Sequence, residues 1–291
     1  MPKTLFKSFL FFLLIGSINL SGQESGKNLH YGNFLYAGTE VSLFQVRDLG
    51  VSPLFYEGTL VGGGAKWQTE TEKWSWELNG SFGTGLITRA ELEVYAARNY
   101  TIHHDFGLWR KIGSIQEDGL GYKVGIAYQG LTNIRNTPAF RNAGVTAESF
   151  NTLLGSGEVE WLFRSNKEQR KLLWLIPLKP GYRVSKLSFR LNLPMLNTLW
   201  GPRFPYLDDF TEGTVDYEQK NELKLGGFRL HSELRYQYLL KNGNGFQFSY
   251  RWDVMKGPND FGRIELAQHN FQAGILIRMN ELKNARSKGT N

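Results

Sequence analysis

The chain contains no cysteine, and this absence excludes several kinds of protein. Without a thiol there is no disulfide, no thiolate-bound metal, no cysteine nucleophile and no lipoprotein anchor. Proline is scarce, at 9 of 291 residues, whereas glycine is plentiful at 33. Because proline cannot donate a hydrogen bond to a sheet and glycine is common in turns, this balance favours many strands joined by turns.

A second absence is that of an apolar run long enough to cross a bilayer as a helix. The compact apolar stretch Phe9–Ile15 follows two lysines and precedes small residues at Gly16–Ser17 and Ser21–Gly22. This order is typical of a secretory signal peptide, so we expect residues 1–22 to be removed. A retained N-terminal anchor is the alternative, and the short apolar run argues against it. Membrane insertion of the mature chain then requires strands that close on each other.

Charge of one sign is not in large excess either. Residues 1–22 hold two lysines and no acidic residue, so their removal lowers the net charge from +7 to +5. The basic residues are spread along the chain, so we expect no nucleic-acid partner. Gly62-Gly63-Gly64 and Gly155-Ser156-Gly157 lack the Lys-Ser/Thr of a phosphate-binding loop, and no Gly-x-Ser-x-Gly occurs. We therefore expect no cofactor.

The feature that is present throughout is alternation of apolar and polar residues. It is clearest in Phe228–Tyr238, where even positions are Phe, Leu, Ser, Leu, Tyr and Tyr, and odd positions are Arg, His, Glu, Arg and Gln. Successive side chains of a strand point to opposite faces, so one face is apolar and the other charged. The wet lumen of a membrane barrel accommodates such a charged face. A soluble lipid-carrier barrel would show the opposite polarity.

About ten stretches alternate in this way, which predicts an all-β fold, a transmembrane antiparallel up-and-down β-barrel. Residues 172–193 change parity near Pro177 and Pro180, which a bulge in a single strand explains. Two separate strands around Lys179–Gly181 are the alternative, and a count of twelve strands stays open. The expected strands are residues 35–46, 59–68, 73–83, 100–109, 121–129, 152–163, 172–193, 222–240, 246–254 and 267–279.

The gaps between these stretches alternate in length. Even-numbered connections are short and odd-numbered ones long, which predicts short periplasmic turns, long extracellular loops and both termini in the periplasm. Large aromatic residues lie beside the short turns and predict a girdle at the periplasmic interface. These aromatic residues are Trp67, Trp74, Trp76, Trp161, Phe163, Tyr238, Phe246 and Phe248.

The last expected strand carries a further signal, Gln272-x-Gly274-x-x-Ile277-x-Met279. It resembles the C-terminal signal of bacterial outer-membrane β-barrel proteins, although here the ends are aliphatic and a polar tail, residues 280–291, follows. The chain therefore resembles that class in general and no one family. The resemblance implies a Gram-negative outer-membrane location, contact with outer-membrane lipid and assembly by the barrel-assembly machinery. The barrel domain is expected to comprise residues 23–279.

The inward parity is rich in charges of both signs. A barrel of about ten strands has a narrow interior filled by side chains, and buried charges there must pair. We expect a salt-bridged, mostly closed lumen, with a small water-filled channel as the alternative. The predicted lumen-facing charges are Glu40, Lys66, Glu77, Lys123, Glu158, Glu160, Arg190, Arg229, Glu233, Arg235, Arg251, Asp253 and Arg278.

A metal site and a protease site each lack a residue arrangement that their chemistry requires. His103 and His104 are adjacent on a strand and point to opposite faces, so they cannot share a metal ion, and we expect no metal site. His103 is instead expected to hydrogen bond with Asp105. Asp208-Asp209 could serve a surface protease, but the five histidines are His30, His103, His104, His231 and His269, and none lies in that loop.

We expect a non-enzymatic protein that is a subunit or surface-recognition element of an envelope complex, with an envelope protein as partner. A porin-like small-solute channel is the alternative, and an outer-membrane hydrolase, either protease or lipase, is the second alternative. Recognition is expected in the long connections 130–148 and 195–218, because loops on a rigid scaffold concentrate function. The candidate residues there are Trp200, Phe204, Tyr206, Asp208 and Asp209.

Overall fold

The computed structural model describes residues 30–48, 52–89, 92–112, 119–136, 145–165, 170–172, 176–178, 183–202, 221–258 and 264–279. The expected signal peptide, residues 1–22, and the expected polar tail, residues 280–291, lie outside these ranges. Within them, no helix is long and apolar enough to cross a membrane.

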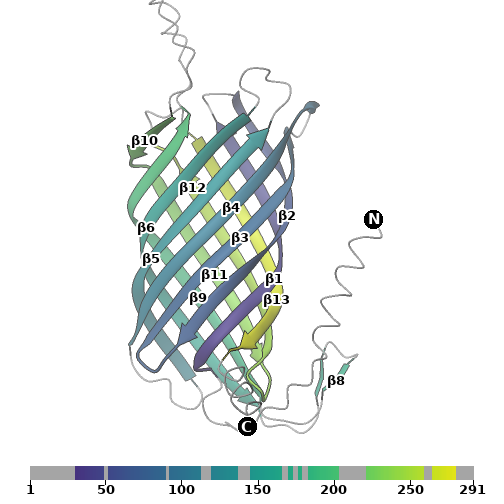
Figure 1. The fold of residues 1–291 in the computed structure, drawn as a ribbon, viewed down its shortest axis with the longest axis vertical. Coiled ribbons are helices and arrows are strands. Elements are labelled where there is room, and N and C mark those ends of the chain that lie inside the picture. Colours follow the sequence, from purple (N-terminus) through teal and green to yellow (C-terminus); the bar gives the residue numbers. More distant parts are fainter. Residues whose placement is uncertain are drawn as a thin grey trace, which may run out of the picture.

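Ten antiparallel strands close into a barrel, with β1 paired to β13 and β6 paired to β9 (Figure 1). The predicted fold class is confirmed. The barrel strands are β1 (Gly32–Asp48), β2 (Ser52–Glu70), β3 (Trp74–Arg89), β4 (Leu92–Ile112), β5 (Gly119–Asn136), β6 (Val145–Ser165), β9 (Arg183–Pro202), β11 (Phe228–Leu239), β12 (Gly245–Lys256) and β13 (Ile264–Arg278).

Three short strands correct the expected layout. The single bulged strand over residues 172–193 is wrong, because β7 (Arg170–Leu172) and β8 (Ile176–Leu178) form a separate small sheet and only β9 enters the barrel. The expected strand 222–240 is interrupted at Gly226 and Gly227, whose φ angles of 120° and 87° favour glycine. Its first part, β10 (Asn221–Leu225), pairs with the end of β9.

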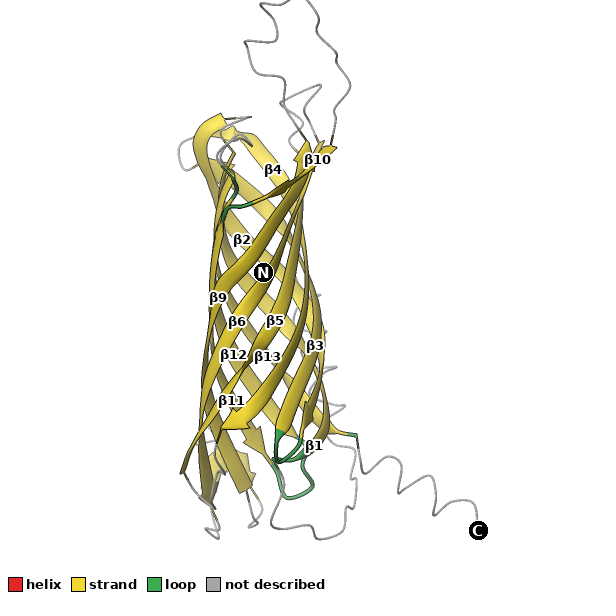
Figure 2. Ribbon diagram, turned by 90° about the vertical axis from the view of Figure 1, so that its left-hand side faces the viewer, coloured by secondary structure: helices red, strands yellow, loops and turns green. Residues whose placement is uncertain are grey.

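The connections also differ from the expected alternation of short and long. We call the end of the barrel where β1 begins and β13 finishes the inner end, and the opposite end the outer end (Figure 2). At the outer end, β1 and β2 are separated only by residues 49–51, whereas the inner connection between β6 and β9 spans residues 166–182. Two of the long loops expected at this end are shorter than predicted. Trp200 lies on β9 and not in a loop, and residues 130–136 and 145–148, which were expected in a loop, belong to β5 and β6.

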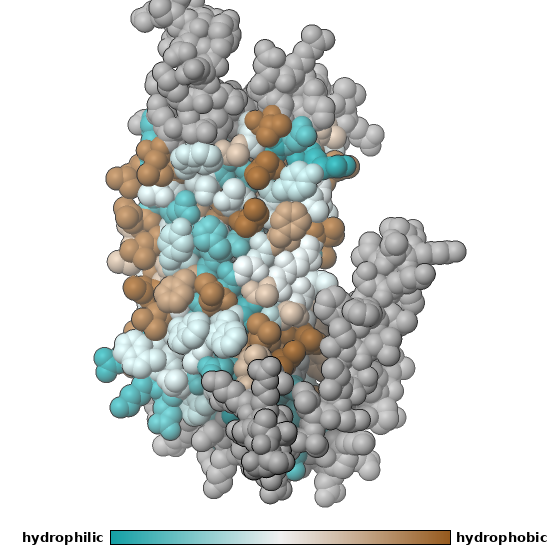
Figure 3. Space-filling model, viewed as in Figure 1, coloured by the Kyte–Doolittle hydropathy of each residue, from teal (hydrophilic) through white to brown (hydrophobic). Residues whose placement is uncertain are grey.

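The strands are longer than a bilayer requires. They contain up to 21 residues, whereas a membrane-crossing strand needs about 9–11. Outward side chains form an apolar belt along the wall, where brown side chains gather in Figure 3. The predicted aromatic girdle points outward at the inner end, as Trp74, Trp161 and Phe248 illustrate with exposed fractions of 46%, 48% and 53%.

Beyond the belt, towards the outer end, the polarity of the two faces is reversed on β1 and β13. On β1, Val46 is fully buried in the lumen, while Gln45 and Arg47 point outward. Arg47 is paired in register with Glu265 and forms an ion pair with it on the outside. On this side of the barrel the outer end has an apolar interior and a mostly polar exterior, as a soluble barrel does. On β5 and β6 the interior of the same end is polar, with Arg135 and Glu148 buried as an ion pair. The inward residues are Phe44, Val46, Tyr56, Leu60, Ile87, Ala97, Leu131, Phe150, Leu199, Met255, Ile264 and Leu266; we call them the outer apolar layer.

Candidate functional site

The lumen at the height of the belt is filled with ion pairs. Every predicted lumen-facing charge except Arg278 is buried there, with an exposed fraction no higher than the 7% of Arg251. Arg278 is half-buried at the inner end, where its guanidinium donates to the carbonyl of Tyr31 at 2.9 Å. Strand alternation places these side chains, since each follows the inward parity of its strand.

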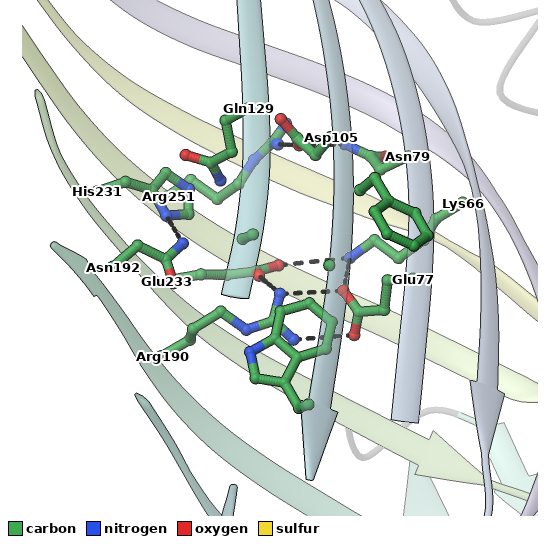
Figure 4. A pocket seen from close by; sticks show the side chains of 14 residues that line it. Lys66, Glu77, Asn79, Asp105, Gln129, Arg190, Asn192, His231, Glu233 and Arg251 are labelled. Carbon is green, nitrogen blue, oxygen red and sulfur yellow. Dashed lines mark hydrogen bonds and ion pairs between the residues drawn. The ribbon is translucent and has the colours of Figure 1, made fainter. Parts of the chain in front are cut away.

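Glu77 lies at the centre of this arrangement (Figure 4). Its carboxylate accepts two hydrogen bonds from Arg190, at 2.9 and 3.0 Å, and two from Arg235, at 2.5 and 3.0 Å. Such paired contacts use the fork geometry of the guanidinium and are among the stronger hydrogen bonds in proteins. One carboxylate from β3 thus connects β9 and β11 across the lumen.

Lys66, Glu158 and Glu233 contact the three side chains just described. We call the six residues the central network: Lys66, Glu77, Glu158, Arg190, Glu233 and Arg235. Glu233 accepts from Arg235 at 2.7 Å and lies 3.5 Å from the Lys66 ammonium. Arg190 Nε donates to Glu158 at 2.6 Å. No member of the network is left without an oppositely charged partner, as buried charges require.

Trp109 supports Arg190 and was not among the predicted site residues. Its ring lies 3.9 Å from the guanidinium carbon of Arg190, and its Nε1 donates to Ser156 at 2.7 Å. The indole covers Gly107, where an added Cβ would come within 1.9 Å of the ring, so only glycine leaves room for it. The signal was available in the sequence, because Trp109 shares the inward parity of His103 and Asp105.

A second group of charges lies near the inner end. The Glu70 carboxylate forms ion pairs with the ammonium groups of Lys123 at 2.7 Å, Lys111 at 2.8 Å and Lys186 at 3.3 Å. Glu160 pairs with Lys123 and Lys186 in turn. Glu70 was not among the predicted lumen-facing residues because it was expected in a turn, whereas β2 continues to Glu70.

His30 precedes β1 and is buried beside this inner group, with an exposed fraction of 6%. Burial, together with the nearby Lys186 and Lys111 ammonium groups, lowers the pKa of the His30 imidazole to about 3. The imidazole is therefore neutral at physiological pH. It adds no further positive charge at an end where three lysines already gather around Glu70.

A third group lies between the central network and the outer apolar layer. Arg251 bridges Glu40 and Asp105, at 3.5 and 3.2 Å. Glu40 also accepts from Asn270 at 2.5 Å and Gln272 at 2.7 Å.

A separate ion pair joins Arg229 and Asp253, in which the guanidinium donates two hydrogen bonds of 3.0 and 2.6 Å to the carboxylate. It also donates to the Gln129 carbonyl at 3.0 Å. This pair is therefore self-contained.

Taken together, the three groups and the Arg229–Asp253 pair are balanced in charge. The acidic members are Glu40, Glu70, Glu77, Asp105, Glu158, Glu160, Glu233 and Asp253. The equally numerous basic members are Lys66, Lys111, Lys123, Lys186, Arg190, Arg229, Arg235 and Arg251. A lumen lined by this set offers no ring of one charge sign that would select ions.

Apolar side chains close the lumen at both ends of the charged region. The outer apolar layer covers it on one side. At the inner end a smaller cluster consists of Phe34, Tyr36, Leu162, Val184, Leu239 and Leu276. Between them, the cavity beside Glu77, Trp109 and His231 offers about 20 Å³ to water, which is room for roughly one molecule.

The histidine pair predicted on β4 is divided between two environments. His103 faces the lumen and contacts Gln268 at 3.3 Å, so the expected bond to Asp105 is wrong; Asp105 instead binds Asn79 and Arg251. His104 faces outward and lies 3.5 Å from the Tyr128 hydroxyl. Among the described residues, no cluster of histidine and acidic side chains could hold a metal ion.

Of the recognition candidates, the described ranges contain only Trp200. It lies on β9 near the outer end, 37% exposed, and is paired in register with Ser149 and Leu223. Phe204, Tyr206, Asp208 and Asp209 lie outside the described residues.

No protein-family model matches the chain, and a search of curated proteins finds no relative. Among solved structures, it is similar to the outer membrane protease OmpT from Escherichia coli, at 8% identity and a TM-score of 0.45, covering 88% of this chain and 98% of that one. It is also similar to the translocator domain of autotransporter NalP from Neisseria meningitidis, at 11% identity and a TM-score of 0.36, covering 95% and 96%.

A third similar structure is the outer membrane protein OprG from Pseudomonas aeruginosa, at 8% identity and a TM-score of 0.29, covering 84% of this chain and 95% of that one. With TM-scores below 0.5, these likenesses add nothing to what the barrel itself shows. They assign no activity to the lumen or to the rim.

Proposed function

We propose that this chain is a closed outer-membrane barrel that acts through its surface, as a subunit or surface-recognition element of an envelope complex. The observation that carries the proposal is the lumen, which side chains fill from the inner apolar cluster through the ion pairs to the outer apolar layer. A barrel filled in this way gives solutes no path, so its working parts are the wall and the two rims. Outer-membrane lipid and, during biogenesis, the barrel-assembly machinery belong to the same proposal.

The two alternatives fit the interior less well. A small-solute channel needs a continuous wet path, whereas the cavity beside Glu77 holds about a single water. A hydrolase needs a base within reach of its substrate, whereas His103 and His231 are buried beneath the outer apolar layer. His104 and His269 lie on the outward face, and each contacts a tyrosine hydroxyl.

The proposal predicts that the purified protein conducts little in a planar bilayer. We expect no steady openings at neutral pH, because side chains of the described residues fill the lumen. A wide diffusion porin reconstituted in the same bilayer serves as the positive control. Stable, frequent openings of the wild-type protein would overturn the proposal in favour of a channel.

The double variant Arg229→Ala with Asp253→Ala sharpens this test, since it removes a self-contained ion pair without leaving a lone charge. The outer apolar layer still closes the lumen in this variant. We therefore expect at most brief openings.

A second prediction concerns recognition at the outer end. Deleting residues 203–209 removes Phe204, Tyr206, Asp208 and Asp209 but leaves β9, which ends at Pro202, intact. We expect the variant to remain folded and heat-modifiable, and to lose its specific cross-linked partner in native envelopes. The matched control deletes residues 138–143 from the connection between β5 and β6, and should keep that partner. A partner retained by both variants would place recognition elsewhere.

A further inference from the structure

The outer wall contains a hollow of about 440 Å³ in the apolar belt, on the face formed by β9, β11, β12, β13 and β1. Two rows of outward side chains run across these strands in register and form it. The first row is Thr39, Ala273, Phe248, Tyr236 and Leu187. The second row is Val41, Phe271, Tyr250 and Leu234. We call this hollow the wall groove.

Small and large side chains give the wall groove its depth. Ala273 and Thr39 form a low floor, and rings rise beside it. The Tyr250 ring is tilted against that of Phe271, with centroids 5.1 Å apart, and stacks on that of His269 at 6.0 Å, so this side is a cluster of packed rings. Neighbouring strands lie about 4.8 Å apart, so the five strands make the groove roughly 19 Å long.

The hydroxyl groups of the wall groove are already hydrogen bonded within the chain. Tyr250 is 2.7 Å from His269 Nδ1, Tyr236 is 3.1 Å from Ser185, and Thr39 donates to the Ala273 carbonyl at 3.4 Å. An occupant therefore need not form hydrogen bonds with these groups of the groove. Its volume is within the range of about 300–1,000 Å³ that is usual for ligand sites.

The position of the wall groove along the barrel shows which part of the membrane surrounds its occupant. Its Leu187 and Tyr236 end is next to the inner aromatic girdle, because Tyr238 and Phe246 follow on the same outward parity of β11 and β12. Its other end, at Val41, lies within the belt and below the level of Arg47 and Glu265. The groove is thus continuous with the lipid-facing surface and opens towards the inner interface.

From this geometry we propose that the wall groove binds one acyl chain of a phospholipid from the periplasmic leaflet. The head group lies at the aromatic girdle, and the chain runs obliquely across β11, β12 and β13 to Val41. A flexible apolar chain fits a long hollow without hydrogen-bonding demands. Because one wall is formed by packed rings, the chain is held there longer than lipid on the rest of the belt.

The test uses phosphatidylethanolamine with a diazirine near the end of one acyl chain, placed only in the leaflet that contacts the inner end. Irradiation followed by peptide mass spectrometry should label Tyr250, Phe271 and Ala273 several-fold more than the outward residues of β5 and β6. Filling the floor with Ala273→Trp should abolish that excess. The control Gly157→Trp, on the outward face of β6 where an added Cβ meets nothing, should not change it.

If Ala273→Trp fails to fold by heat-modifiability, Thr39→Phe fills the same floor from β1. Even labelling around the belt, or an excess that survives both filling variants, would overturn the proposal. An excess seen only with the probe in the opposite leaflet would assign the groove to lipid of the outer face and would equally overturn it. The result does not depend on whether the lumen conducts.

Discussion

Replacing Glu77 by leucine should lower the free energy of unfolding by about 3–5 kcal/mol, the usual cost of removing one partner from a buried charge cluster. The carboxylate is the common acceptor of Arg190 and Arg235, and it lies 4.0 Å from the Lys66 ammonium. Without it, Glu158 and Glu233 alone would have to balance these three cations. Urea titration, followed by the heat-modifiable shift in gel mobility, measures the loss.

Glu265→Leu is the matched control, because it removes the partner of Arg47 from an ion pair that is about a quarter exposed. Exposed pairs contribute about 0–1 kcal/mol, so this variant should unfold almost as the wild type does. A loss for Glu77→Leu as small as for Glu265→Leu would mean that water reaches the central network. The lumen would then be wet, and the proposal of a closed barrel would fail with it.

The faces of the strands were predictable because side-chain alternation is local. In β11, Arg229, Glu233 and Arg235 are buried while Phe228 and Leu234 are exposed, as the parity of Phe228–Tyr238 predicts. A strand has a period of two whatever its partners are, so sequence alone suffices. For the same reason the predicted charges face the lumen at the right positions.

The pairing of those charges was not predictable, because it depends on how the barrel closes. Glu77 and Arg235 are 158 residues apart in sequence, and strand tilt and stagger bring them together. The parity change near Pro177 was equally ambiguous. A bulge within one strand and an interruption between two strands give the same local pattern. The structure has a separate small sheet there.

The strand ends were misjudged for a different reason. The expected strands were drawn around the stretches with apolar residues on the outward parity, and most of them stop short of the observed ends. The first expected strand, residues 35–46, stops two residues before the end of β1 at Asp48, in a part of the strand where Gln45 and Arg47 point outward. Alternation continues with its polarity reversed, because this part of the wall faces water and its interior is packed like a soluble core.

That reversal predicts that Phe44→Ala is as damaging as a substitution in a soluble protein core, at about 3–5 kcal/mol of unfolding free energy. Phe44 is 2% exposed and belongs to the outer apolar layer, so its loss leaves a cavity between packed side chains. The adjacent Gln45→Ala, on the exposed face of the same strand, should cost within about 0.5 kcal/mol. Both values come from the same urea titration.

The opposite result would identify the outer end as a wet vestibule. In a wet vestibule, water fills the space left by the Phe44 ring, and Phe44→Ala costs no more than Gln45→Ala. Planar-bilayer recording of Phe44→Ala adds a second measurement. With the layer packed as observed, one missing ring widens the outer end, but the central network and the inner apolar cluster still close the lumen. Phe44→Ala should therefore be less stable and still silent, a combination that neither a porin nor an open vestibule would show.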